Sequence, residues 1–311
     1  MHPSVSIIIP CYNKVNYIAS AIESALSQTY PCEVIVVDDG STDGSLDVIK
    51  AYEKHIVWVT GNNKGGCAAR NIGVEISSGT YLQFLDADDI LPQEKISIQM
   101  ATLKHSSQNS IAVCPWQFLH DDGQLNPPAS KIYWKNYSEG INLLVDMWFH
   151  GGFFATHSWL IPRALILEIG TWNTTLIADQ DGEFFGRILS CSGPIFFCED
   201  TIVQYRIPPK GSVSRDTSRP AMKSRIKAYK VVSKCILARR DDRMARRACL
   251  SRIRQIAYAL RESDDMLLQS VSLERRLSVF DFSPSLPFVS RVLIGLLGIR
   301  LGLAVRDIFK S

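Results

Sequence analysis

The 311-residue sequence has no run of about 18 apolar residues, the length that a helix needs to cross a bilayer. Its first ten residues hold no Lys or Arg, and the apolar run Val5–Ile9 is too short for the core of a signal peptide. We therefore expect a cytoplasmic protein that is either soluble or bound peripherally to the inner face of a membrane.

The sequence also lacks any Cys-x-x-Cys pair, although it holds eight cysteines. These are Cys11, Cys32, Cys67, Cys114, Cys191, Cys198, Cys235 and Cys249. Their wide spacing argues against a zinc site or a disulfide framework. We expect buried, unpaired thiols.

Charge is distributed unevenly along the chain. Residues 1–205 contain 11 Lys or Arg and 22 Asp or Glu, a net charge of −11, whereas residues 206–311 contain 23 and 9, a net charge of +14. This change of sign predicts a domain boundary near residue 205.

Short apolar runs alternate with segments of helical periodicity. Strands are expected at 5–10, 34–37, 56–60, 81–85 and 111–119, and helices at 18–26, 45–54, 66–76 and 92–105. Continuous apolar strands between helices predict a mainly parallel sheet that is covered on both faces.

Polar segments follow four of these strands. They are Pro10–Asn13, Asp38–Ser41, Gly61–Arg70 and Asp86–Asp89. In such sheets ligands bind at the carboxyl ends of the strands, so these four loops predict a binding cleft.

Three carboxylates follow the apolar run Tyr81–Leu85 within four residues: Asp86, Asp88 and Asp89. Carboxylates at this density repel one another, and Mg²⁺ or Mn²⁺ would relieve the repulsion. Asp86 and Asp88 would point to the same side of an extended loop. The alternative is a solvated acidic turn in which Asp89 caps a helix that begins near Pro92. The cluster alone leaves both interpretations open.

Four motifs, in order, closely resemble the nucleotide-binding half of family 2 glycosyltransferases with the GT-A fold. They are Ile8–Asn13, Glu33–Ser45, Asn63–Gly73 and Phe84–Asp89. The resemblance implies a GT-A type, Rossmann-like sheet covered by helices. It also implies a catalytic domain over 1–215, with a nucleotide-binding half at about 1–115 and an acceptor half at about 116–215. Residues 216–311 would form a basic helical extension.

The resemblance implies a role for several residues. Asp39 would accept a hydrogen bond from the nucleotide base, against which Tyr12 could pack. Arg70 would approach the base or the phosphates. Asp86 would face the ribose and a Mn²⁺ or Mg²⁺ ion, and Asp88 would bind that ion directly.

Other residues of the same motifs are expected to contact the nucleotide-sugar: Pro10, Asn13, Asn63 and Ala87. For Asp38, contact with the ligand and hydrogen bonding to nearby backbone N–H groups are equally open.

The segment 177–187 resembles the acidic segment of the family that carries the catalytic base. Alignment on the aromatic residues that follow puts the base at Asp181, with Asp179 as the alternative. Gln180 stands where the family commonly has Glu. Either Asp could instead cap a helix that begins near Glu183.

Five further residues are candidates for contacts with the acceptor or the diphosphate: Trp116, His157, Trp159, Arg206 and Arg215. For the aromatic ones, a place in the core is the more frequent alternative.

The resemblance implies a metal-dependent, inverting transfer of a single sugar to a hydroxyl group, in cell-surface polysaccharide or glycolipid biosynthesis. The chain has neither the membrane spans nor the Gln-x-x-Arg-Trp motif of processive synthases in the family. Two alternatives are a non-catalytic nucleotide-sugar binding protein and a sugar-nucleotide nucleotidylyltransferase. The second would carry a Gly-rich basic loop after the first strand, and Pro10–Asn13 is not one.

The apolar segment Val292–Leu303 lies within the basic region. A positive charge and apolar side chains favour a helix on an anionic membrane surface. An oligomer contact is the alternative. No nucleic-acid motif accompanies the charge, so we expect none as a partner.

Overall fold

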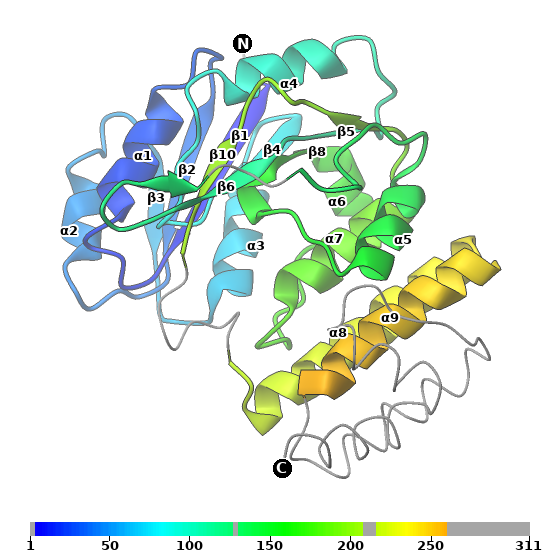
Figure 1. The fold of residues 1–311 in the computed structure, drawn as a ribbon. Coiled ribbons are helices and arrows are strands. Elements are labelled where there is room, and N and C mark those ends of the chain that lie inside the picture. Colours follow the sequence, from blue (N-terminus) through cyan, green and yellow to red (C-terminus); the bar gives the residue numbers. More distant parts are fainter. Residues whose placement is uncertain (1–3, 127–129, 208–215, 260–311) are drawn as a thin grey trace. The chain divides into compact units, whose positions relative to one another are not determined.

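The computed structural model describes residues 4–126, 130–207 and 216–259 (Figure 1). The chain divides into two compact units, each built from separate segments. The first contains Met1–Glu139, Phe154–Thr174 and Ser192–Ile207, and the second contains Gly140–Phe153, Thr175–Cys191 and Pro208–Ser311. The functional division expected at residue 215 stays a prediction.

The first unit is built around a seven-stranded sheet. Its strands are β1 (Val5–Cys11), β2 (Glu33–Asp38), β3 (Val57–Thr60), β4 (Tyr81–Phe84), β5 (Ile111–Val113), β8 (Trp159–Pro162) and β9 (Ile195–Phe197). They lie in the order β3-β2-β1-β4-β8-β5-β9. Only β8 runs antiparallel to its neighbours in this sheet. The prediction of a mainly parallel sheet is confirmed.

A smaller sheet in the same unit contains β10 (Val203–Arg206), β6 (Trp116–Leu119) and β7 (Leu125–Asn126), in that order. The expected strand at 111–119 is therefore two strands, β5 and β6, which belong to different sheets. The break falls at Cys114–Pro115, where proline cannot donate a ladder hydrogen bond.

Helices of the first unit follow the strands in alternation. They are α1 (Ile18–Leu26), α2 (Ser45–Lys50), α3 (Gly66–Ile76), α4 (Lys95–Leu103) and α6 (Arg163–Ile169), with the 3₁₀ turn η1 (Thr156–Ser158). The strand order reverses after β3, so right-handed crossovers place α1 and α2 on one face and α3 on the other. Both α1 and α3 pack on β1 and β2.

The centre of the core is β1, in which every residue is buried. Its neighbour α3 approaches closely because position 73 is a glycine. A Cβ atom on Gly73 would meet the side chain of Ile8 at 2.3 Å. This close packing of α3 on β1 restricts the position of the strand that leads into the loop after Cys11.

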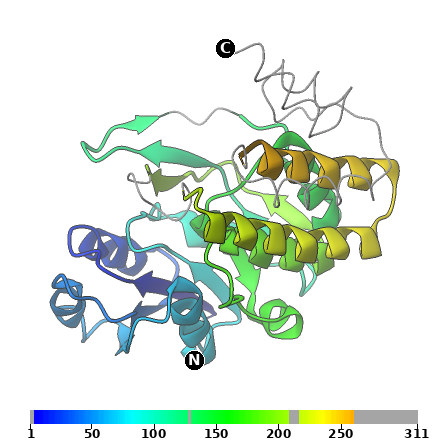
Figure 2. The same ribbon diagram turned by 90° about the horizontal axis from the view of Figure 1, so that it is seen from below.

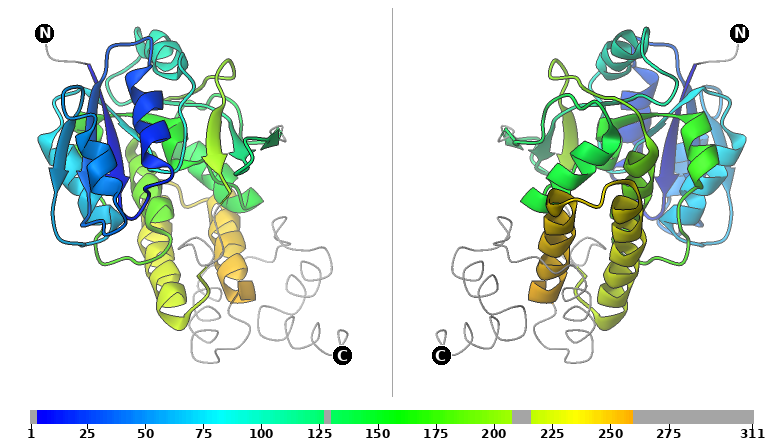
Figure 3. Two further views of the ribbon diagram at one scale, coloured as in Figure 1. Left: turned by 90° about the vertical axis from the view of Figure 1, so that its left-hand side faces the viewer. Right: turned by 90° about the vertical axis from the view of Figure 1, so that its right-hand side faces the viewer.

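The described residues of the second unit form four helices: α5 (Gly140–His150), α7 (Gln180–Cys191), α8 (Arg219–Arg239) and α9 (Arg243–Ala259). α5 packs against α7 and α9, and α7 packs against α8. α8 and α9 lie side by side, joined by the short connection 240–242 (Figures 2 and 3). The basic extension expected over 216–311 is helical at α8 and α9, as far as Ala259.

No helix within residues 4–126, 130–207 and 216–259 is both long and apolar enough to cross a membrane. The apolar segment Val292–Leu303 lies outside these ranges, so the expected membrane-surface helix stays a prediction.

All eight cysteines are free, as expected. Five of them are buried: Cys11, Cys67, Cys114, Cys198 and Cys249. Cys191 is exposed, so the expectation of burial is wrong at that position. It stands at the last residue of α7, where the helix ends at the surface.

Lys95 is fully buried on the inner side of α4. Its Nζ donates a hydrogen bond to the side-chain oxygen of Gln83. Burial lowers the pKa of the Lys95 ammonium to about 8, against an ordinary value of 10.5, and nearby thiols oppose the shift only in part. The charged form is therefore less favourable in the folded protein than in the unfolded chain.

Replacing Lys95 by Met should change how stability depends on pH. Between pH 8 and 10.5 the unfolded wild-type chain binds more protons at this lysine than the folded one, so wild-type stability rises with pH there. Relative to Lys95→Met, the wild type should gain roughly 2–3 kcal/mol in free energy of unfolding across this window, at about 1.36 kcal/mol per pKa unit. Urea unfolding at several pH values measures this. The exposed Lys54→Met is the control, and parallel pH curves for wild type and Lys95→Met would contradict the expectation.

Candidate active site

The carboxyl ends of β1, β2, β3 and β4 meet at one edge of the sheet in the first unit. Backbone hydrogen bonds join the loops that follow them. Asp39 N donates to Cys11 O at 2.8 Å, Gly61 N donates to Asp38 O at 3.2 Å, and Leu85 N donates to Ile8 O at 2.9 Å. The four polar segments found in the sequence therefore lie at neighbouring positions along this edge.

Asp38 is buried and supports the backbone. Its carboxylate accepts hydrogen bonds from Ser41 N at 3.2 Å and from Thr60 Oγ1 at 2.6 Å. Two roles were left open for Asp38, contact with the ligand and hydrogen bonding to nearby backbone. The structure shows the second of these.

Asp39 joins the loop after β2 to the loop before α3. Its two oxygens accept hydrogen bonds from Lys64 N and Gly65 N, both at 2.8 Å. A carboxylate oxygen has a second lone pair, so Asp39 keeps acceptor capacity for a nucleotide base. The neighbouring Gly40 has φ +76°, and a Cβ there would meet Gly61 O at 2.8 Å. Base recognition by Asp39 stays a prediction, supported by a rigid loop.

Tyr12 and Asn13 follow β1 directly, and both are exposed. Asn13 has φ +53°, a left-handed conformation that asparagine tolerates better than most residues. Its Oδ1 accepts a hydrogen bond from Thr42 N at 2.8 Å, and its own N–H donates to Ser41 Oγ at 3.0 Å. Tyr12 is 45% exposed, which leaves its side chain accessible to a base.

Three of the remaining motif residues differ in accessibility. Pro10 lies inside β1, paired with Val37, and is buried. Ala87 is also buried, whereas Asn63 is exposed. Contact with a nucleotide-sugar stays a prediction for all three.

Asp89 belongs to the interior of the unit. It is 1% exposed, its Oδ1 accepts a hydrogen bond from Arg206 N at 2.8 Å, and its Oδ2 lies 3.0 Å from His157 Nδ1. Burial raises the pKa of Asp89, and the adjacent His157 opposes this shift. The residue that precedes α4 is Glu94, so the alternative in which Asp89 caps that helix in a solvated turn is wrong.

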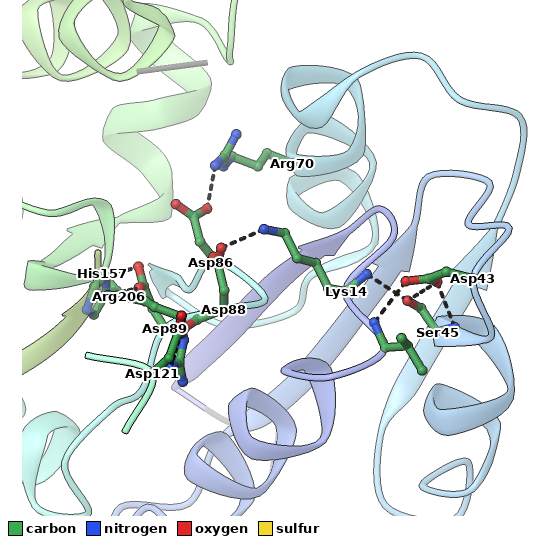
Figure 4. Close-up of polar contacts among 11 residues, drawn as sticks. Lys14, Asp43, Ser45, Arg70, Asp86, Asp88, Asp89, Asp121, His157 and Arg206 are labelled. Atoms are coloured by element: carbon green, nitrogen blue, oxygen red, sulfur yellow. Dashed lines mark hydrogen bonds and ion pairs between the residues drawn. The ribbon is translucent and has the colours of Figure 1, made fainter. Parts of the chain in front are cut away.

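Asp86 and Asp88 are only partly buried, with side chains 27% and 23% exposed. Each carboxylate faces a cation (Figure 4). Asp86 pairs with the guanidinium of Arg70, and Asp88 Oδ2 lies 2.6 Å from Lys14 Nζ. Burial lowers the pKa of the Lys14 ammonium, but the charge and hydrogen bond of Asp88, together with the charges of Asp86 and Asp89, outweigh burial and the net pKa is raised. Lys14 is therefore charged throughout the neutral range.

Arg206, at the end of β10, connects the acidic loop to two other segments. Its Nε donates to Asp88 O at 2.9 Å, and one terminal nitrogen lies 3.2 Å from Asp121 Oδ1. The guanidinium also lies over the ring of Tyr17, 4.5 Å from its centroid. The expected contact of Arg206 with a diphosphate stays a prediction. Arg215 lies outside the part of the chain that the structure describes.

Two carboxylates, not three, are available for a divalent cation. Among residues 4–126, 130–207 and 216–259, no group of three or more His, Cys, Asp or Glu side chains is arranged to hold a metal. Mg²⁺ is commonly bound by one or two carboxylates together with substrate phosphates. Asp86 and Asp88 fit that donor set, because both are oxygen ligands on one loop and both are partly exposed. They do not fit a closed, all-protein metal site.

The aromatic candidates are core residues. His157 is fully buried and its Nε2 lies 3.1 Å from Gln204 O. Trp159 is 1% exposed and packs edge-on against Phe154, and Trp116 is 7% exposed. All three lie in the core, which is the alternative considered for them in the sequence. Contact with a sugar stays a prediction for each.

The second acidic segment lies in the other unit, at the start of α7. Asp181 is in the first turn of that helix and is exposed. Asp179 precedes the helix with φ +58°, and both of its carboxylate oxygens accept hydrogen bonds from Arg252 Nη2, at 2.9 Å each. The two candidate bases therefore differ in environment.

Two charged residues were missed in the sequence. Lys14 directly follows the Tyr12-Asn13 pair at the end of β1, and this position alone could have identified it. Arg252 gave no such signal, because it is one of many arginines in a basic helix and lies 73 positions from its partner, Asp179.

Residues 6–170 match the family model described as glycosyl transferase family 2. The sequence is 30% identical over 210 residues to the uncharacterized glycosyltransferase RT0329 of Rickettsia typhi, covering 66% of this chain and 64% of that protein. It is 40% identical over 111 residues to the putative teichuronic acid biosynthesis glycosyltransferase TuaG of Bacillus subtilis, covering 34% and 44%. The chain thus spans less than two thirds of the length of these relatives.

Two solved structures resemble the whole chain. One is S. aureus TarS 1–349 in complex with UDP-GlcNAc, with a TM-score of 0.74 and 17% identity, covering 100% of this chain and 92% of that one. The other is the mannosyltransferase PcManGT of Pyrobaculum calidifontis with GDP-Man and Mn²⁺, with a TM-score of 0.56 and 15% identity, covering 100% and 88%. At this identity, the likeness concerns the fold.

Proposed function

Because the chain belongs to glycosyl transferase family 2, we propose that it transfers a single sugar from a nucleotide-diphospho-sugar to a hydroxyl group of an acceptor. One observation carries this proposal. The partly exposed carboxylates of Asp86 and Asp88 lie with two cations, Lys14 and Arg70, at the edge where β1, β2 and β4 end. Ligands of open α/β sheets bind at this edge.

The donor would lie along that edge. Tyr12 offers an exposed ring to the base, and Asp39 offers an acceptor that two backbone N–H groups hold in place. A diphosphate carries negative charge, and its oxygens could form ion pairs with Lys14, Arg70 and Arg206. The similar structures bind UDP-GlcNAc and GDP-Man, respectively, which supports a nucleotide-diphospho-sugar as the class of donor.

A Mn²⁺ or Mg²⁺ ion would be held by Asp88 and Asp86. When bound, such an ion stabilises the charge that grows on the departing diphosphate. The two carboxylates supply the oxygen ligands, while Arg70 fixes the direction of Asp86 by its ion pair. Arg70 also stacks on Trp172, 4.5 Å from the ring, and this contact limits its own movement.

Asp181 would act as the general base of an inverting transfer. It would accept the proton of the acceptor hydroxyl as that oxygen attacks the anomeric carbon, a contribution of about 10²–10⁴-fold. Exposure of Asp181 in the first turn of α7 supports this role. Asp179 is the alternative base, and both of its oxygens accept hydrogen bonds from the guanidinium of Arg252.

The acceptor would be a carbohydrate or lipid-linked glycan of the cell surface. TuaG, the similar protein from Bacillus subtilis, is named for teichuronic acid biosynthesis. The net charge of +14 over residues 206–311 supports a peripheral position on an anionic membrane at the cytoplasmic face. A homo-oligomer is the alternative use of the same region.

Donor binding should depend on a divalent ion through Asp88. Isothermal calorimetry of nucleoside diphosphates, with Mn²⁺ or with EDTA, should show tighter binding with the ion for the wild type. For Asp88→Ala this gain should fall by at least about tenfold, because a charge-assisted ligand is lost. Asp121→Ala is the matched control. Asp121 is an exposed carboxylate that pairs with Arg206, the arginine that also donates a hydrogen bond to the backbone of Asp88. Equal affinity with and without Mn²⁺ in the wild type would contradict metal dependence.

Proton transfer should depend on Asp181. Asp181→Asn keeps the shape of the side chain and removes its basicity, so turnover should fall by about 10²–10⁴-fold. Affinity for the donor should stay within a few-fold, and Asp179→Asn should be milder. Measuring release of the nucleoside diphosphate tests this. An inactive Asp179→Asn beside an active Asp181→Asn would move the base to Asp179. Wild-type donor binding without any turnover would favour a non-catalytic binding protein.

A further inference from the structure

We infer that Arg252 and Ser224, on the two C-terminal helices, are positioning residues that hold the acidic segment 175–181 and thereby aim Asp181. The inference rests on the proposed function, in which Asp181 is the base. It assigns to the basic helices a part in catalysis that is separate from any contact with a membrane.

The first contact is an ion pair between α9 and the residue before α7. Arg252 Nη2 lies 2.9 Å from both oxygens of Asp179. The two side chains are 26% and 16% exposed, so the pair is largely shielded from water. A partly desolvated, charge-assisted pair holds its members more firmly than an exposed one.

The second observation is the backbone of Asp179. It has φ +58°, and the only other non-glycine residue with positive φ among 4–126, 130–207 and 216–259 is Asn13, in the proposed donor site. Such a conformation is uncommon for residues other than glycine and persists where the surroundings enforce it. The ion pair with Arg252 is one such constraint.

Gly182 completes this arrangement. A Cβ atom at this position would lie 2.3 Å from Asp179 Oδ1 and 3.0 Å from Asp179 Cγ. Any larger residue would therefore push the carboxylate away from its present place. The chain has a glycine where the Asp179 side chain folds back over the first turn of α7.

Ser224, on α8, holds the preceding residues through one hydroxyl group. Its Oγ donates to Ala178 O at 2.8 Å and accepts from Ile177 N at 3.0 Å and Ala178 N at 3.1 Å. A serine hydroxyl has one proton and two lone pairs, so its full capacity is spent on this segment. One turn further along α8, Lys227 Nζ donates to Thr175 Oγ1 at 2.7 Å.

These contacts hold the backbone at 177 and 178 and the side chains of Thr175 and Asp179, and Asp181 follows two residues later. A catalytic group must be held within a fraction of an ångström of its productive place, and an error of 1 Å can cost about 10²-fold in rate. The basic helices therefore set the direction in which α7 begins. Loss of either contact should reduce turnover before it reduces donor affinity, since the donor motifs lie in the other unit.

The test compares purified full-length variants: Arg252→Gln, Arg252→Lys, Asp179→Asn and the double variant Arg252→Gln/Asp179→Asn. Arg246→Gln is the matched control, because Arg246 is on the same helix and pairs with Asp241 at the surface. Arg252→Gln and Asp179→Asn should each lower kcat about tenfold while the KM for the donor changes less than about twofold. The double variant should be no worse than either single one, and Arg252→Lys should recover part of the loss.

A second readout does not need activity. In hydrogen exchange, the amides of residues 177–183 should exchange faster in Arg252→Gln and in Ser224→Ala than in Arg246→Gln. An inactive wild type would remove the proposed function, while this readout still decides whether the contacts hold the segment. If the wild type is active, two results overturn the inference. One is unchanged kcat in Arg252→Gln and Asp179→Asn, and the other is multiplication of the two losses in the double variant.

Discussion

The arrangement of the first unit depends on neutralising carboxylates that the ends of parallel strands bring together. Asp38 and Asp39 are satisfied by backbone N–H groups and a hydroxyl, so they stabilise loops. Asp89 lies inside the core, where one oxygen accepts a hydrogen bond from Arg206 N and the other lies 3.0 Å from His157 Nδ1. Asp86 and Asp88 instead pair with the side-chain cations Arg70 and Lys14, and both carboxylates are partly exposed. Proximity to solvent therefore separates the carboxylates that build the edge from those that a ligand can reach.

In the second unit, an ion pair and hydrogen bonds hold an acidic segment in place. Its acidic segment has a strained backbone at Asp179, and the contacts that hold it come from helices more than 40 residues away in sequence. A region whose composition indicates only a basic surface thus also determines local geometry. The charge of Arg252 acts on one carboxylate, that of Asp179.

The sequence predicts the strands β1 to β4 and the polar loops after them well, because these signals are local. A buried run such as Val5–Cys11 identifies a strand, and the polar residues after it identify an edge. It fails where a partner is distant or a break is subtle. At Pro115 an apparent single strand is divided into two strands that belong to different sheets. Asp89 resembles a helix cap in the sequence, because its partner His157 lies 68 residues further along the chain. No local pattern indicates that Arg252 pairs with Asp179.

The central claim is that the edge formed by β1, β2 and β4 binds the diphosphate of a sugar nucleotide together with a divalent ion. A crystal structure of the protein soaked with a nucleoside diphosphate and Mn²⁺ tests it most directly. The account predicts an anomalous Mn²⁺ peak beside the carboxylate of Asp88, with the base next to Tyr12 and Asp39. A nucleotide bound elsewhere, or one bound at this edge with no Mn²⁺ and with the Lys14–Asp88 pair intact, would contradict it.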